Sequence, residues 1–121
     1  MNSYFGWAWP PTPWNESSYV QINKMSDLSA ANTADVFLFA DMNPASICHS
    51  GFVITRQWYY HIPFAGNNGS GVLSYADGHV ETHRWKEEAT LKPNYYLLNH
   101  FQGNPKNQDL EWLLQHASVP K

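Results

Sequence analysis

Three side chains that could bind a metal ion alternate along one short segment: His79, Glu81 and His83. In an extended strand, residues two apart point to the same side, so the three side chains would share one face. Imidazole and carboxylate groups are suitable ligands for zinc, nickel or iron. Alternate strand residues lie about 6.5 to 7 Å apart, so a metal centre needs a further group, from His61 or His49. The alternative is an ordinary polar strand face exposed to solvent.

Calcium is a second candidate ion, because three aspartates fall at the ends of expected strands. These are Asp35, Asp41 and Asp77. Backbone carbonyls would have to complete the shell of six to eight oxygens that calcium prefers. The sequence lacks the dense Asp/Asn loop of an EF-hand. Zinc and calcium are therefore the two ions to test, and no other cofactor is expected.

A β-hairpin must position the three candidate metal ligands. Asp77-Gly78 separates two strand-like runs, residues 72–76 and 79–85, and Asp-Gly is typical of a two-residue hairpin turn. Such a turn predicts the pairs Ala76–His79, Tyr75–Val80, Ser74–Glu81 and Leu73–Thr82. In this register Leu73, Tyr75 and Val80 form the core side of the hairpin. The opposite side carries His79, Glu81 and His83.

The flanking segments predict a single α+β domain over residues 1–121. Residues 35–41 form an apolar run with an aspartate at each end, a strand expected to be buried on both faces or nearly so. A second strand is expected over 51–58. A glycine-rich connection at 66–71 leads to the hairpin, which completes an antiparallel β-meander of about four strands over 35–85. An amphipathic helix is predicted over 104–117, with Asn104 as its cap and Pro105 in its first turn. One face of this helix carries Leu110, Leu113, Leu114 and Ala117.

Residues 35–85 carry several short motifs in a fixed order: Phe39-Ala-Asp-Met-Asn-Pro44, Gly51-Phe52, Asp77-Gly78 and His79-Val-Glu-Thr-His-Arg-Trp85. This order resembles the C-terminal globular region of the prepilin-like, or type II secretion pseudopilin-like, proteins of planctomycetes and verrucomicrobia. The chain departs from the family pattern at two positions. Asn67 stands ten positions before Asp77, where the family has histidine, and Met42 stands in place of an acidic residue.

The resemblance implies a structural or assembly protein of an extracytoplasmic family and implies no reaction. It assigns scaffold roles to five positions: Asp41, Gly69, Gly71, Asp77 and Gly78. Members of the family begin with a leader and a long apolar helix, and this sequence has neither. It is therefore expected to be either a truncated form or a stand-alone relative of the globular half.

Aromatic residues are abundant, with six Trp, seven Tyr and six Phe among 121 residues. Two groups could form a contact surface for a sugar ring, a small ligand or a protein. Trp7, Trp9 and Trp14 lie in a proline-rich segment, predicted to be an extended arm over residues 1–15 whose rings pack onto the domain or onto a second copy of the chain. A second copy is the favoured contact for these three rings, which predicts a homo-oligomer. Trp58, Tyr59 and Tyr60 form the other group. The alternative is that these rings fill the core.

Composition narrows the functional classes. The net charge is −3 and basic residues do not cluster, which argues against nucleic-acid partners. The single Cys48 excludes an internal disulfide, and is either a buried small residue or a reactive thiol. The sequence predicts neither a membrane segment nor an export signal, so the chain is expected to be soluble and its location stays open.

Catalytic motifs are weak. No Gly-x-Ser-x-Gly elbow occurs, the glycine-rich segment lacks the Lys-Ser/Thr of a phosphate loop, and the adjacent Glu87 and Glu88 would diverge. The leading hypothesis is a non-enzymatic domain that self-associates or binds a protein. A carbohydrate- or small-ligand-binding module is the alternative. A metal-dependent enzyme centred on His79, Glu81 and His83 is third.

Overall fold

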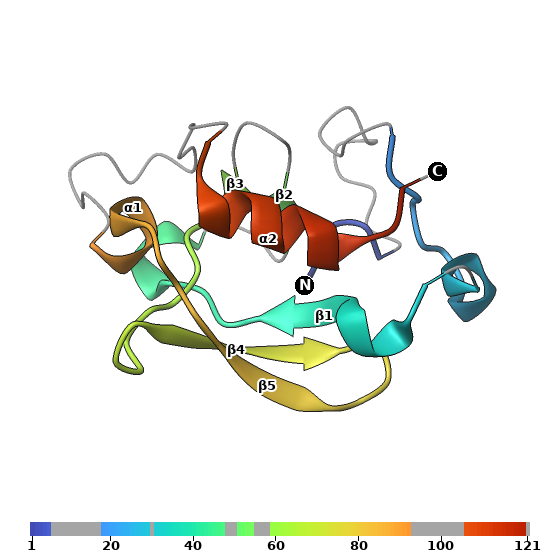
Figure 1. Cartoon of the computed structure of the whole chain (residues 1–121), viewed down its shortest axis with the longest axis horizontal. Helices are drawn as coiled ribbons and strands as arrows, with labels where there is room; N and C mark the ends of the chain where they lie inside the picture. The colour runs from blue at the N-terminus through green and yellow to red at the C-terminus, as the bar shows by residue number, and fades with distance from the viewer. Residues whose placement is uncertain (6–17, 30, 48–50, 55–58, 93–105, 121) are drawn as a thin grey trace.

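A three-stranded antiparallel sheet and a C-terminal helix form the architecture (Figure 1). The computed structural model describes residues 1–5, 18–29, 31–47, 51–54, 59–92 and 106–120. The sheet has the order β1 (Phe37–Ala40), β4 (Ser70–Tyr75), β5 (Val80–Arg84). A separate antiparallel pair is formed by β2 (Val53–Ile54) and β3 (Tyr59–Tyr60). Helix α2 (Gln108–Ala117) contacts β1 and β2, so the predicted α+β class is confirmed.

Strand order differs in detail from a simple meander, because β2 and β3 leave the main sheet and β1 pairs directly with β4. The remaining elements are short. They are the 3₁₀ helices η1 (Met25–Leu28), η2 (Thr33–Asp35) and η3 (Pro44–Ser46) and the single-turn α-helix α1 (Glu88–Leu91).

Helix α2 presents the predicted apolar face to the core: Leu110, Leu113, Leu114 and Ala117 are buried. The predicted start is wrong. The helix begins at Gln108, and its cap is Asn107, whose Oδ1 accepts the Leu110 N–H at 3.0 Å. Asn107 has the extended backbone of an N-cap residue. The predicted cap, Asn104, lies outside the described residues.

The first residues of the chain are part of the core, whose cluster of buried side chains runs from Tyr4 to Ala117. The Asn2 amide is fully buried and donates to the carbonyl oxygens of Phe37 at 2.8 Å and Ala117 at 2.7 Å. The hydroxyl of Tyr4 donates to the Ile54 carbonyl. Residues 1–5 of the predicted arm therefore pack onto the domain itself and join β1, β2 and α2 together. Residues 6–15 of that arm lie outside the described residues.

The β4–β5 hairpin has a different register from the predicted one. Ser74 pairs with Val80 and Leu73 with Glu81, because the connecting loop contains three residues, 76–78. The Gly78 N–H donates to the Tyr75 carbonyl and the Tyr75 N–H to the His79 carbonyl. Gly78 has φ +95°, as expected for a type I turn followed by a glycine bulge. A two-residue turn would need positive φ at Asp77 as well, and Asp77 has none.

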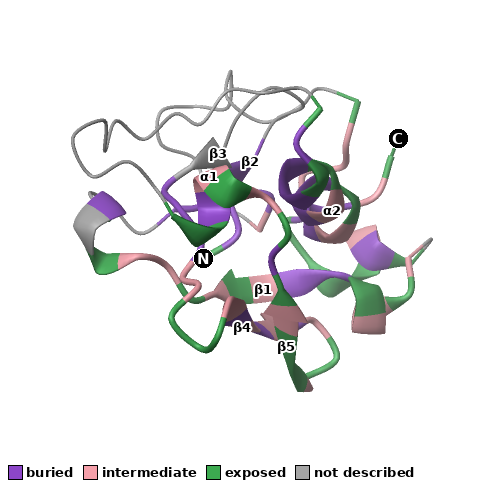
Figure 2. Ribbon diagram, turned by 60° about the vertical axis from the view of Figure 1, so that its left-hand side comes forward, coloured by how far each residue is buried: buried purple, intermediate pink, exposed green. Residues whose placement is uncertain are grey.

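A one-residue shift exchanges the two faces of β5. His79, Glu81 and His83 still share a face, but it is the face of Leu73 and Tyr75. Val80 was predicted to be in the core and is instead 61% exposed. Figure 2 shows buried residues gathered between the sheet and α2, with exposed ones along β5.

Strand β1 is not buried on both faces, because Phe39 is 54% exposed. A bulge between Phe37 and Phe39 places Phe37 opposite Tyr75 and Phe39 opposite Ser74. The sheet surface turned away from the core therefore has partly apolar character. We refer to it as the outer sheet face, formed by Phe39, Val72, Ser74 and Val80.

Candidate functional site

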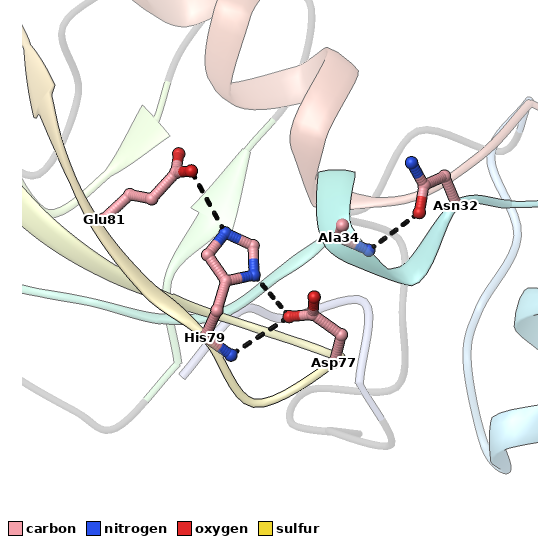
Figure 3. Close-up of polar contacts among 5 residues, drawn as sticks. All are labelled: Asn32, Ala34, Asp77, His79 and Glu81. Atoms are coloured by element: carbon pink, nitrogen blue, oxygen red, sulfur yellow. Dashed lines mark hydrogen bonds and ion pairs between the residues drawn. The ribbon is translucent and has the colours of Figure 1, made fainter.

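His79 lies at the turn end of the hairpin between two carboxylates (Figure 3). Its Nδ1 contacts Asp77 Oδ1 and its Nε2 lies 3.3 Å from Glu81 Oε1. The same Asp77 oxygen accepts the His79 backbone N–H at 3.0 Å. The imidazole also stacks on Tyr75, with ring centroids 4.4 Å apart and planes within 8°. The turn therefore holds the His79 ring by one of its faces and by both of its nitrogens.

These contacts favour the charged form of His79. The hydrogen bond to Asp77 is the main cause that raises the pKa of His79 above its ordinary 6.5, and Glu81 adds to it. Hydrogen bonds from the backbone N–H and ring of His79 lower the pKa of Asp77. Both ring nitrogens of His79 therefore face carboxylates of its own hairpin.

His83 lies at the other end of β5 in an aromatic stack. Its ring stacks on Trp112 with centroids 3.6 Å apart, and His116 stacks against Trp112 at 4.1 Å. Trp85 meets His83 edge-on at 4.8 Å. Burial is the main cause that lowers the pKa of His83, with the charges of His116 and Lys86 acting in the same direction and that of Asp109 opposing them. His83 therefore favours the neutral form.

Asp109 connects the end of β5 to helix α2. Its carboxylate is 1% exposed and accepts the backbone N–H groups of Lys86, at 2.9 and 3.1 Å, and of Glu87, at 2.9 Å. In return, Glu87 Oε1 accepts the Gln108 N–H at the start of α2. A cavity of about 310 Å³ opens beside this connection. Its lining residues are His83, Lys86, Gln108, Asp109, Glu111, Trp112 and Gln115.

The structure does not bring the three predicted zinc ligands together. His79 and Glu81 contact each other, whereas His83 is turned to Trp112. His61 is buried in the core with φ 79°, and His49 lies outside the described residues. Within the described part of the chain, no group of three or more His, Cys, Asp and Glu side chains is arranged to hold a metal. Asp35, Asp41 and Asp77, the proposed calcium ligands, are all exposed and form no such group.

The glycines of the hairpin have a structural role. A Cβ at Gly71 would lie 2.5 Å from the Phe64 carbonyl oxygen and 2.9 Å from Trp85 Nε1, which donates to that oxygen. Gly71 therefore allows the close approach that buries Trp85. Gly69 has φ +83° just before β4. The Asp41 N–H donates to the Val72 carbonyl at the far end of the β1–β4 pair.

The predicted aromatic contact residues are largely outside the described part of the chain. Trp7, Trp9, Trp14 and Trp58 lie there, as does Cys48, and Tyr59 and Tyr60 are described only as the backbone of β3. Sequence reasoning missed the pairing of Trp112 with His116. Their spacing of four residues on one helix is the signal that could have revealed it.

Comparisons with protein families, with curated proteins and with solved structures find no match for this chain. Among the helices that the structure describes, none has the length and apolar character needed to cross a membrane.

Proposed function

We propose that this chain is a non-enzymatic assembly domain, of the type implied by its resemblance to pseudopilin-like proteins, that binds a protein partner through its outer sheet face. The observation that carries the proposal is the exposure of Phe39, at 54%, and Val80, at 61%, on that face. Both residues lie on ordered strands of one sheet rather than on loops.

The outer sheet face has the chemistry of a protein contact. A shallow depression of about 520 Å³ lies over this face, lined by Phe39, Ala40, Asp41, Val72, Ser74 and Val80. Exposed apolar groups gathered on one surface gain free energy when a partner removes them from water. The same face carries the polar side chains of Ser74, Thr82 and Arg84 beside its apolar groups, so its complement is an apolar surface with a polar rim.

The hairpin histidines support a structural role better than a catalytic one. His79 already contacts two carboxylates, and His83 is packed against Trp112. Carbohydrate binding gains no support from Trp112, because histidine rings cover both faces of its indole. A sugar ring needs an open aromatic face.

Site-specific photo-cross-linking in the organism that encodes the chain tests the proposal. A benzophenone amino acid replaces Phe39 in one variant and Val80 in another, and the matched control carries it at Lys24, an exposed residue outside the sheet. We expect cross-links to an identified protein of an envelope assembly, or to the chain itself, from the two sheet positions. Cross-links that form equally from Lys24, or none from Phe39 and Val80, contradict the proposal.

A further inference from the structure

The outer edge of β5 has main-chain groups with no hydrogen-bond partner among the described residues. Tyr75 N–H donates to the His79 carbonyl, and Trp85 N–H donates to the Gly69 carbonyl. Since hydrogen-bonded and non-hydrogen-bonded pairs alternate in an antiparallel ladder, the N–H and C=O groups of Val80, Thr82 and Arg84 point away from β4. Among the described residues, none donates to or accepts from these groups. β5 forms the lower margin of the sheet in Figure 1, with no described element beyond it.

We propose that two copies of this chain pair edge to edge through β5, antiparallel and centred on Thr82, to form one continuous six-stranded sheet. The inference deepens the proposed function, because it names a second copy as a partner and rests on an assembly role. In this register Val80 lies opposite Arg84 of the second copy, Glu81 opposite His83, and Thr82 opposite Thr82. Each of the pairs Val80–Arg84, Thr82–Thr82 and Arg84–Val80 can exchange two main-chain hydrogen bonds.

The sequence of β5 favours this register over its neighbours. A pairing centred on Glu81 places the two Glu81 carboxylates directly opposite each other, and like charges in that position destabilise a strand pair. A pairing centred on His83 leaves Val80 without a partner. Only the register centred on Thr82 uses all three outward-facing residues and places no like charges opposite each other. Repulsion between Glu81 carboxylates therefore disfavours the neighbouring register and leaves the two-fold pairing centred on Thr82.

The edge is continuous with the outer sheet face. Val80, Thr82 and Arg84 alternate with Glu81 and His83, so their side chains lie on the face of Val72 and Ser74. Pairing would join the two outer sheet faces into one surface twice as wide, with Val80 of both copies near its centre. Edge pairing and the apolar contact of the proposed function would then reinforce each other.

Proline substitution at Thr82 tests the pairing on the 121-residue chain. The Thr82 N–H faces outward, so Thr82→Pro removes no hydrogen bond between β4 and β5, and proline is tolerated on edge strands at such positions. Thr82→Val is the matched control, because it keeps the N–H. By sedimentation equilibrium we expect a dimer for the wild type and for Thr82→Val, and a dissociation constant raised roughly tenfold or more in Thr82→Pro. A wild-type chain that is monomeric up to millimolar concentration overturns the pairing.

Disulfide trapping checks the register without weakening the fold. In a Cys48→Ser background, Thr82→Cys is expected to form a covalent dimer under mild oxidation, and Lys24→Cys is not. A hydrogen-bonded pair has its Cα atoms about 5.5 Å apart, which is within disulfide range. Equal trapping at both positions contradicts the register.

The two proposals can fail separately. If the chain dimerises but Thr82→Pro has no effect while Phe39→Asp dissociates the dimer, edge pairing fails and the proposed function stands. If edge pairing holds but Phe39 and Val80 give no cross-links in cells, the proposed function fails instead.

Discussion

The two ends of strand β5 place a histidine in opposite environments. His79 and His83 are four residues apart on one face of the hairpin, yet the pKa of His79 is raised and that of His83 is lowered. At the turn, the ring meets Asp77 and Glu81 at the surface. At the other end, it is packed between Trp112 and Trp85. The contrast shows that the neighbouring side chains, and not strand position, determine the chemistry of each histidine.

The two ends of β5 also differ in the contacts that stabilise them. Local contacts within residues 75–81 fix the turn end, where every partner of His79 is within four residues. The helix end depends on long-range contacts, because Asp109 and Trp112 come from α2. Substitutions at the helix end should therefore cost more stability, and substitutions at the turn end should act locally.

Removing the Asp109 carboxylate has the largest expected effect. Asp109→Ala leaves the backbone N–H groups of Lys86 and Glu87 without their acceptor. We expect the free energy of unfolding, measured with urea, to fall by about 2 to 3 kcal/mol. Glu111→Ala, on the exposed side of the same helix, is the control and should change it by less than about 0.5 kcal/mol. Equal losses in the two variants would show that the helix end does not depend on this connection.

Removing the Trp112 ring, which lies between the two stacked histidines, should lower the free energy of unfolding by a smaller amount. Trp112→Ala is expected to lower the free energy of unfolding by about 1 to 2 kcal/mol. It should also bring the pKa of His83 up toward 6.5, because the cause of the shift is burial. NMR titration of the histidine ring protons measures both sites at once. An unchanged pKa at His83, or an equal change at His79, would contradict the separation of the two ends.

At the turn, the backbone of Gly78 is the sensitive feature. No atom lies within 4 Å of a Cβ built at this position, and φ is +95°. Gly78→Ala should therefore cost about 1 to 2 kcal/mol through backbone strain alone. Gly78→Asn should cost less, since asparagine tolerates positive φ better than alanine. Similar losses in the two variants, measured by thermal unfolding, would argue against the glycine-bulge turn.

Sequence patterns predicted the features that depend on local chemistry. The hairpin, the strand at residues 37–40 and the apolar face of α2 were identified because their periodicity and turn residues are local signals. The register was wrong, because Asp-Gly fits both a two-residue turn and a three-residue loop with a glycine bulge. The one additional loop residue shifts the register by one position, which exchanges the two faces of β5 and places Val80 at the surface.

Features built from distant segments could not be predicted. Asn2 hydrogen-bonds to Phe37 and Ala117, and Asp109 to the residues that follow β5. Nothing in the local pattern of either residue distinguishes it from an exposed polar side chain. The spacing of His79, Glu81 and His83 correctly placed them on one face, but only the positions of Asp77 and Trp112 show that they do not act together.

The pH dependence of stability should separate the two histidines with the smallest effects. The folded-state pKa of His83 is below 6.5, so the unfolded chain binds its proton more readily, and stability is lost as the pH falls through 6.5. For His79 the folded-state pKa is above 6.5, so its contribution is present below 6.5 and is lost as the pH rises through the raised value. Between about pH 5 and pH 8, the decrease of the melting temperature toward acid pH should therefore be smaller in His83→Gln than in the wild type. In His79→Gln the decrease of the melting temperature toward alkaline pH should be smaller than in the wild type. A change on the same side of the pH range in both variants would mean that one environment governs both rings.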